Sequence, residues 1–486
     1  MKQTEPITWN SVPQVLRVAS SKPGQLVIFA LAALLLVPPF GYYAVAVAIV
    51  LLAAGNLPAK RRKILSGLAA VLFLTGAVFG SREWESAKWI TGSLICFLAL
   101  QLLWAQAIPR LPKSVNRYAV PLLHAILIAF IATVWRLRLR GAIRLDLALA
   151  LGALALELLW RGSYWIRWQV RQNGQGAFLE NLFALIPFVG TGGIPYGKGP
   201  DFFTRYEATD SRQLAISRLK GLHLLVLALL WSILSAIIQS VIFSLPAPWV
   251  PGLVSKPLPS PEFPLLPMMR QLFQDPSLLA LWMRWGALLV ELMRLILALA
   301  TNGHRVVALY CLAGFAIPRN TDNPLLANSL VDFWARYWYY FKEVLMDFFF
   351  FPVFLRLRGL PLIPRTLAAT AAAAFVGNLY FHLFVYAPQL MKPHGGQYAD
   401  LAQLRVIFCA ILAAGLCWSF TFLLMRKSNA NKTRWARFWR TARWIRLPYM
   451  VGVTAFFALL HVWTYGDAAI TLRDRLHLLL AMFDPS

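Results

Sequence analysis

Apolar residues in this chain of 486 residues are gathered in long, almost continuous blocks that short polar loops separate. Many of these blocks are about 17–25 residues long, which is the length that an α-helix needs to cross a bilayer. Other blocks are too short or too broken to cross alone, so we expect re-entrant or interfacial helices beside roughly 11–13 transmembrane helices. The pattern therefore predicts an all-α polytopic integral membrane protein.

The composition agrees with this class. The chain is 59% hydrophobic and 14% charged, whereas soluble domains carry roughly a quarter charged residues, which excludes a soluble globule, a secreted disulfide scaffold and a disordered chain. The four cysteines lack the spacing of metal ligands, so no metal site is predicted. The net charge of +27 would indicate nucleic acid in a soluble protein. Here the basic residues lie in short loops, so we expect membrane lipids as partners and no nucleic acid.

Charged and proline-rich segments indicate the orientation of the chain. The clusters at 60–63 and 426–446 are basic and predict cytoplasmic segments, whereas the turn at 82–85 contains two glutamates and is expected outside. The segment 426–446 also carries tryptophans four positions apart, which is typical of a basic helix lying in the membrane interface. The connection between Ser244 and Leu279, proline-rich at 246–267, predicts a partly ordered loop with short interfacial helices.

The segment 329–354 combines many aromatic residues with a regular series of polar ones. On one helix, with about 100° per residue, the polar positions fall within an arc of roughly 80°. They are Asp332, Arg336, Tyr340, Glu343 and Asp347. Because charges are costly in hydrocarbon, such a stripe must face protein, water or head groups. It predicts either the wall of a polar cavity or an interfacial helix whose charges pair with one another.

A histidine, His382, stands deep inside an apolar block, one helical turn after Asn378. Imidazole is the side chain best suited to exchange a proton near neutral pH, so His382 is a candidate catalytic base. A structural histidine that bonds within its own helix is the alternative. Two weaker candidates are Glu291 with Arg294, which we interpret as a neutralising pair, and the glycine-rich stretch 190–200, which lacks the pattern of a phosphate loop.

The stripe and the histidine belong to a longer ordered pattern. Its positions are Asn320, Pro324, Asp332, Phe333, Trp334, Arg336, Asp347, Pro352 and, further on, His382. This pattern resembles the signature of the membrane-bound O-acyltransferases, in particular the bacterial branch with the alginate O-acetyltransferases and the teichoic-acid D-alanyl transferase. Trp338 stands where that family has its first histidine, and Tyr380 and Phe381 precede His382 in place of the family's Leu-Trp.

The resemblance implies a central funnel in the membrane and transfer of an acyl group, such as acetyl, to a hydroxyl of an extracytoplasmic polysaccharide or lipid. The implied donor is acyl-coenzyme A or an acyl-carrier-protein thioester, with no permanently bound cofactor. It also implies a multi-pass protein of the bacterial cytoplasmic (inner) membrane, and a separate extracytoplasmic acyltransferase as a possible partner. His382 is the expected general base. The residues expected to line the cavity are Asn378, Tyr380, Arg336, Tyr340, Glu343 and Asp347.

By the same resemblance the chain divides into N-terminal transmembrane helices at 1–175, an acyltransferase-like core at 176–403 and C-terminal transmembrane helices at 404–486. Two other functions stay open. The tryptophan at position 338 favours a catalytically diverged transporter or assembly subunit. The acidic turn at 82–85 would fit a polyprenol-dependent glycosyltransferase.

Overall fold

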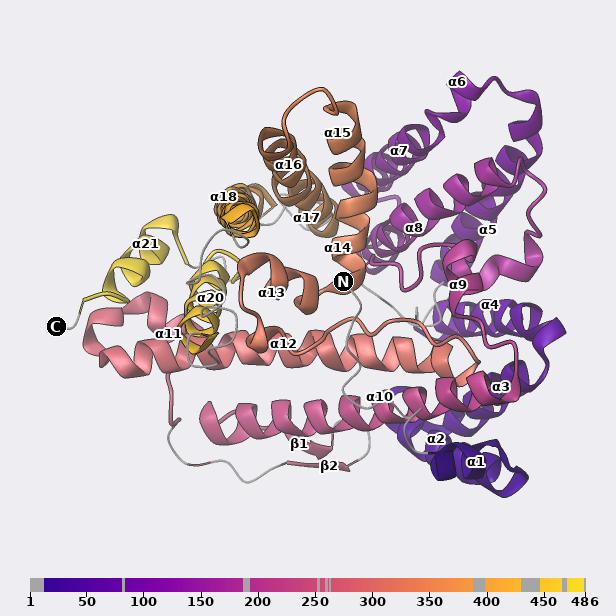
Figure 1. Ribbon diagram of the computed structural model, residues 1–486, viewed down its shortest axis with the longest axis horizontal. Coiled ribbons are helices and arrows are strands. Elements are labelled where there is room, and N and C mark those ends of the chain that lie inside the picture. The colour runs from indigo at the N-terminus through magenta and orange to yellow at the C-terminus, as the bar shows by residue number, and fades with distance from the viewer. Residues whose placement is uncertain are drawn as a thin grey trace. The chain divides into compact units, whose positions relative to one another are not determined.

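The computed structural model describes residues 13–80, 84–186, 193–250, 254–257, 261, 264–387, 398–429, 446–465 and 470–484. Figure 1 shows that these residues are almost entirely helical. The chain forms two compact units that are interleaved in sequence. Unit 1 comprises Met1–Leu229, Asn302–Arg319 and Ala387–Gly396, and unit 2 comprises Leu230–Thr301, Asn320–Tyr386 and Gln397–Ser486. We describe each unit by itself; the three segments expected from the sequence stay a prediction.

Unit 1 is built from the N-terminal helices. They are α1 (Pro13–Ser20), α2 (Lys22–Phe40), α3 (Ala44–Asn56), α4 (Arg61–Gly80), α5 (Trp84–Ala107), α6 (Lys113–Asn116), α7 (Ala119–Leu139), α8 (Leu145–Arg171) and α9 (Pro200–Tyr206). Helix α3 packs against α2 and α4, and α8 packs against α5 and α7. The guanidinium of Arg61 is buried at the start of α4, where it donates to the carbonyl oxygen of Ala208 at 2.9 Å and to Glu207 at 3.3 Å. This pairing lets a charge lie inside the unit.

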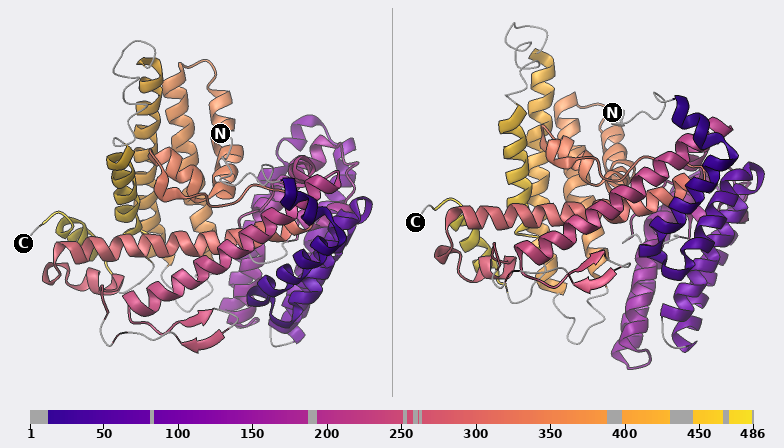
Figure 2. Two further views of the ribbon diagram at one scale, coloured as in Figure 1. Left: turned by 60° about the horizontal axis from the view of Figure 1, so that its bottom comes forward. Right: turned by 90° about the horizontal axis from the view of Figure 1, so that it is seen from below.

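Helices α10 (Ser211–Ile237) and α12 (Leu281–Leu312) contribute residues to both units. The other elements of unit 2 are β1 (Pro248–Val250), β2 (Val254–Pro257), α11 (Met269–Gln274), α13 (Leu330–Tyr337), α14 (Tyr339–Leu345), α15 (Phe351–Arg356), α16 (Leu362–Ala371), α17 (Asn378–Tyr386), α18 (Tyr398–Asn429), α20 (Arg446–His461) and α21 (Leu472–Ala481). Helices α16 and α17 pack along α18, and in Figure 2 the orange and yellow helices of this unit run side by side. Two π-helical turns, Met346–Phe350 and Ala372–Gly377, join α14 to α15 and α16 to α17.

The connection from Ser244 to Leu279 contains a short helix, α11, as expected, and in addition an antiparallel hairpin that we did not expect. In the hairpin, Pro248 pairs with Pro257 and Val250 with Val254. Proline lacks an N–H group and is tolerated in strands at a sheet edge, and both strands of a two-stranded hairpin are edges. Residues 430–445 of the basic segment and residues 82–83 of the acidic turn lie outside the described residues, so those expectations stay predictions.

Five described helices are long and apolar enough to cross a membrane. They are Ser86–Arg110, Ala119–Leu139, Ser211–Ile242, Leu362–Tyr386 and Tyr398–Leu424. The bent pairs α1–α2 and α3–α4, with angles of 86° and 112°, raise the number to seven if each pair is one span. The protein is thus an all-α polytopic membrane protein, with fewer long spans in its described residues than the roughly 11–13 expected. Some apolar blocks form shorter helices, such as α20 with 16 residues, and the long helices α8 and α12 carry several charged residues.

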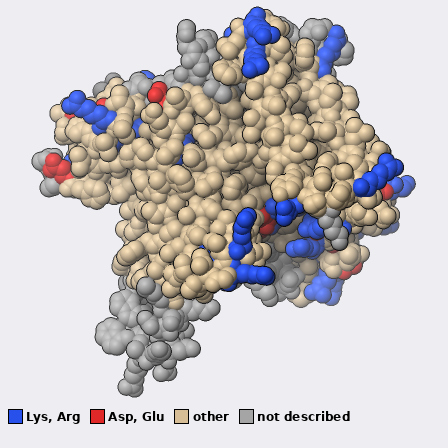
Figure 3. Space-filling view, turned by 90° about the horizontal axis from the view of Figure 1, so that it is seen from above, with Lys and Arg blue, Asp and Glu red and all other residues tan. Residues whose placement is uncertain are grey.

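Large apolar side chains are exposed on these helices, as expected of surfaces in contact with lipid. Leu26 on α2, Ile95 on α5 and Trp418 on α18 are 69%, 60% and 75% exposed. On the face drawn in Figure 3, most of the described surface carries neither basic nor acidic residues. Soluble monomers seldom expose apolar surface so widely, which agrees with membrane-spanning helices.

Candidate active site

The segment 329–354 does not form one helix. Helix α13 ends at Tyr337 and α14 begins at Tyr339, because Trp338 between them adopts an extended backbone with φ −144° and ψ 78°. The π-helical turn Met346–Phe350 then changes the angle between successive residues again. The predicted stripe on a single face is therefore wrong, since its five polar residues lie on three differently phased pieces of helix.

Two of the stripe residues pair with each other. Arg336 donates through Nε to Oδ1 of Asp332 at 2.9 Å, one turn apart on α13. On α14, Glu343 forms an ion pair with Lys342 at 3.0 Å. These contacts agree with the interpretation in which the charges of the segment neutralise one another.

Asn320, at the head of the signature, supports the break at Trp338. Its backbone carbonyl accepts the N–H of Tyr339 at 2.9 Å, and its side-chain Oδ1 accepts the N–H of Tyr340 at 3.3 Å. Both N–H groups lie in the first turn of α14 and have no partner within that helix. A side chain that is fully buried thus holds the start of α14 in place.

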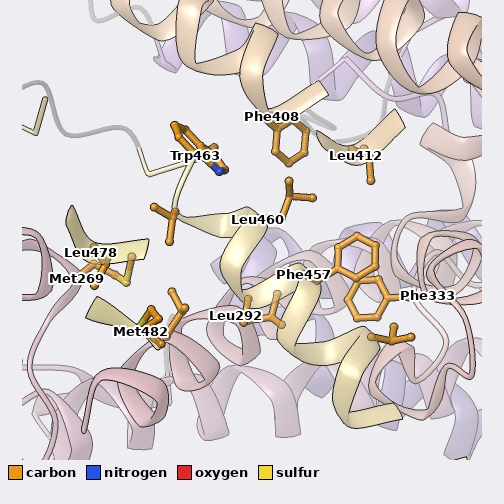
Figure 4. Close-up of a cluster of buried hydrophobic side chains, with 14 of the residues drawn as sticks. Met269, Leu292, Phe333, Phe408, Leu412, Phe457, Leu460, Trp463, Leu478 and Met482 are labelled. Carbon is orange, nitrogen blue, oxygen red and sulfur yellow. The ribbon is translucent and has the colours of Figure 1, made fainter. Parts of the chain in front are cut away.

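A cavity of about 270 Å³ lies within unit 2 beside this break. Residues of α12, α13, α14, α17, α18 and α20 form its wall, which is largely aromatic and aliphatic. Its lining residues with polar atoms in their side chains are Trp334, Tyr337, Trp338, His382, Arg405, His461 and Thr464. Figure 4 shows part of the same wall, where Phe333, Phe408, Phe457 and Leu460 gather.

The cavity brings together four of the residues singled out from the sequence, namely Phe333, Trp334, Trp338 and His382. The other predicted cavity-lining residues do not belong to its wall; they are Asn378, Tyr380, Arg336, Tyr340, Glu343 and Asp347. The break at Trp338 accounts for Tyr340, Glu343 and Asp347, because it changes the direction of the residues that follow α13. It does not account for Arg336, which precedes the break, or for Asn378 and Tyr380, which lie on the same helix as His382.

His382 is held by aromatic rings. Its ring is roughly parallel to that of Tyr386, with centroids 6.2 Å apart, and meets the ring of Phe408 edge-on at 5.7 Å. With the described residues its imidazole makes no hydrogen bond, so they give no support to the alternative of a structural histidine bonded within its own helix. Both ring nitrogens remain available to a ligand in the cavity.

Arg405, on α18, brings a positive charge into the same wall. Its Nη2 donates to the hydroxyl of Tyr386 and to the carbonyl oxygen of Thr464, the latter at 2.9 Å. The guanidinium also lies over the rings of Tyr386 and Phe408, at 5.2 and 5.5 Å from their centroids. Arg405 and His382 therefore share two aromatic neighbours.

Asn378 and Tyr380 are not placed to orient the imidazole. Asn378 is fully buried, and neither polar atom of its amide has a hydrogen-bond partner among the described residues. Tyr380 instead contacts the rings of Phe349 and Phe384, at 6.4 and 5.7 Å. Neither residue therefore contacts the imidazole of His382 through a hydrogen bond among the described residues.

Sequence reasoning missed Arg405 and His461 as site residues. Arg405 stands near one end of an apolar block without a polar neighbour at helical spacing, so no local pattern marks it. His461 is followed at helical spacing by Thr464 and Tyr465, a signal that could have marked it. The pair of Glu291 and Arg294 is present as interpreted, with Arg294 donating to both carboxylate oxygens at 2.8 and 2.6 Å. What the sequence could not indicate is that His461 lies 3.9 Å from the same carboxylate.

A second cavity, of about 670 Å³, lies in unit 1 between α5, α7 and α8. Its wall is apolar apart from Lys88, Ser93, Cys96 and the indole of Trp89, and contains neither an imidazole nor a carboxylate. The smaller cavity is therefore the better candidate for chemistry, because it alone of these two carries groups that exchange a proton near neutral pH.

The fold and this cavity define the chain as a polytopic helical membrane protein with an imidazole-lined cavity in one of its units. A search with protein-family models finds no match to the chain, and none of the curated proteins matches it.

Proposed function

We propose that this protein is a membrane-embedded O-acyltransferase of which His382 is the general base. The proposal is carried by one observation: His382 lines a cavity together with Phe333 and Trp334 of the signature. Phe333 and Trp334 lie on a different helix from His382, and all three resemble positions of a single family's motifs, whereas Trp338 in the same wall departs from them. Their meeting at one cavity supports the resemblance.

In the proposed reaction the imidazole of His382 takes the proton of the acceptor hydroxyl while its oxygen attacks the carbonyl carbon of a thioester. The carbon–sulfur bond then breaks, and the thiolate leaves and takes up a proton. The Arg405 guanidinium, held by Tyr386 and Thr464, stabilises the negative charge that develops on the carbonyl oxygen.

The size of the cavity supports a short acyl group. Ligand pockets generally measure about 300–1,000 Å³, and this cavity, at about 270 Å³, is slightly smaller. An acetyl group on the thioester of coenzyme A or of a carrier protein would fit it, with the hydroxyl of a polysaccharide or lipid as acceptor. We further propose the bacterial inner membrane as the location, which reporter fusions to the loop at 60–63 and to later loops would test.

The test is acetyl transfer in membranes that contain His382→Ala. Membranes are supplied with radiolabelled acetyl-coenzyme A, and label in the polysaccharide and lipid fractions is counted. Loss of a general base is expected to lower the rate about 10²–10⁴-fold. His477→Ala, which changes an exposed histidine of α21, is the matched control and should transfer normally. Unchanged transfer by a well-folded His382→Ala variant would disprove the mechanism.

A catalytically diverged transporter or assembly subunit is the second candidate. Trp338 favours it, because the indole N–H in this wall has no hydrogen-bond partner among the described residues and cannot accept a proton. The two candidates differ in the product. Export that requires the protein but yields a product without an acyl group would support the second.

A further inference from the structure

The larger cavity, in unit 1, lies among helices that are long and apolar enough to cross a membrane. The spans Ser86–Arg110 and Ala119–Leu139 include most of α5 and all of α7, and the cavity of about 670 Å³ lies between these helices and α8. Two residues of its wall, Trp89 and Ile126, are 50% and 38% exposed. The cavity is therefore a groove that opens on the surface of the membrane-spanning helices, where lipid chains surround the protein.

Small residues hollow out the middle of this groove. Gly92, Ser93 and Cys96 form its wall on α5, and Ala155 contributes from α8. A Cβ atom added at Gly92 would meet no atom of the described residues within 4 Å outside its own stretch of helix. Open space therefore lies directly against the backbone of α5.

The groove follows α5 for about the depth of one lipid leaflet. Its wall on this helix begins at Lys88 and ends at Leu100, and twelve residues of α-helix rise about 18 Å. One leaflet contributes about 15 Å of hydrocarbon, half of a bilayer core of about 30 Å. The length of the groove therefore suits an acyl chain that runs from the head groups toward the middle of the bilayer.

The width and the chemistry of the groove also favour a lipid chain. A volume of about 670 Å³ over a length of about 18 Å corresponds to a width of roughly 7 Å, whereas an α-helix with its side chains is about 10–12 Å wide. A further protein helix would not fit. The largely apolar wall offers water few hydrogen-bond partners, and an empty groove would forfeit dispersion contacts.

One end of the groove carries a charge. Lys88 is exposed and is the one charged residue among the described residues of the wall, and Trp89 stands beside it. Both belong to the first turn of the span Ser86–Arg110, where lysine ammonium groups and tryptophan rings meet lipid head groups. A positive charge at this level attracts head groups of net negative charge. The opposite end, at Phe97 and Leu100, is apolar.

We propose that this groove binds an anionic phospholipid, with one acyl chain along α5 and the head group at Lys88. The inference is independent of the proposed acyltransferase function, because it concerns a different cavity in the other unit. No outcome of its test depends on acyl transfer.

The experiment compares two photoactivatable lipids in nanodiscs of phosphatidylcholine that contain the full-length protein. The probes are phosphatidylglycerol and phosphatidylcholine with the same diazirine group in one acyl chain, and labelled peptides are quantified by mass spectrometry. The peptide with Leu230, which is 50% exposed within the span Ser211–Ile242, is the reference for ordinary lipid contact. We expect segments 92–100 and 126–130 to be labelled more strongly than the reference. The phosphatidylglycerol probe should label them about fivefold more than the phosphatidylcholine probe, which is the effect of one cation near an anionic lipid.

Substitution of Lys88 tests the head group. Lys88→Gln removes the charge, so the two probes should label the groove about equally. Arg110→Gln is the matched control, because it removes an exposed charge at the other end of the same span, and it should leave the preference unchanged. Equal labelling by both probes in the wild-type protein, or a preference that survives Lys88→Gln, overturns the anionic head group at Lys88.

Filling the groove tests the chain. Gly92→Leu places a side chain in the open space and should lower the labelling of the unaltered segment 126–130 to the level of the Leu230 reference. Cys96→Phe, at an exposed position of the same wall, should do the same and serves if Gly92→Leu does not fold. Gly452→Leu is the control, since a Cβ atom there also meets no described atom within 4 Å, but on α20; it should change nothing.

Two results would overturn the lipid site itself. One is groove labelling in the wild-type protein that is no stronger than at the reference peptide, which would show that the groove holds no lipid. The other is strong labelling of 126–130 that persists in both filling variants, which would place the lipid elsewhere on the surface of these helices.

Discussion

The stacked rings of Phe333 and Phe457 allow the packing around the cavity to be tested quantitatively. Their centroids are 3.8 Å apart and their planes are inclined by 15°. The two residues are 1% and 6% exposed, and Figure 4 shows the rings face to face between α13 and α20. Phe333→Ala and Phe457→Ala should each remove one side of this contact.

The expected loss follows from what truncation removes. Truncating a buried phenylalanine costs a soluble protein about 3–5 kcal/mol, of which about 1.5–3 kcal/mol is the transfer of the side chain out of water. In a micelle the unfolded helices keep apolar side chains in hydrocarbon, so the transfer part is small. The lost packing remains, and each substitution should lower the free energy of unfolding by about 2 kcal/mol.

The assay is equilibrium unfolding in mixed micelles of dodecyl maltoside and dodecyl sulfate. The double variant completes a cycle whose coupling free energy should be about 0.5–1.5 kcal/mol for an aromatic pair. Leu355→Ala on α15, at a side chain 65% exposed, is the control and should change stability by less than about 0.5 kcal/mol. Single losses as small as that of the control, or a coupling of zero, would refute the stacked arrangement.

Three other substitutions are measured in the same way. Arg405→Met removes the donor to Tyr386 and to the carbonyl of Thr464 and should cost about 3 kcal/mol; an unchanged stability would contradict these bonds. Asn378→Leu removes an amide without a partner among the described residues and should be neutral or stabilising, whereas a clear loss would reveal a partner. The backbone and hydroxyl of Thr471 donate to Asp474 and lower the pKa of that carboxyl. This stabilisation is present above about pH 4 and is lost as the pH falls through the lowered pKa. Thr471→Ala should therefore cost about 1 kcal/mol of stability at neutral pH and less in acid. An equal cost at neutral and at acid pH would argue against these hydrogen bonds.

The membrane class was predictable because long apolar blocks indicate it without any contact between distant residues, and the structure confirms it. That the polar residues of the segment 329–354 do not share one face was not predictable, because a constant angle per residue assumes an unbroken helix. The break at Trp338 depends on Asn320, whose bonds to the start of α14 cross a loop. The contact of His461 with a carboxylate was also not predictable, because that carboxylate, Glu291, belongs to a helix distant in the sequence. The catalytic role of His382 stays a prediction.

The π-helical turn at Ala372–Gly377 has a consequence for how this chain tolerates insertions and deletions. Such a turn accommodates one residue more than ordinary α-helical winding. If the same residues were wound regularly, everything after them would rotate by about 100°, and Phe381 would stand where the imidazole of His382 now stands. Deleting Ala373 should therefore be absorbed by a return to ordinary winding, with His382 still facing its cavity, whereas deleting a residue from α17 ahead of His382 would turn it aside.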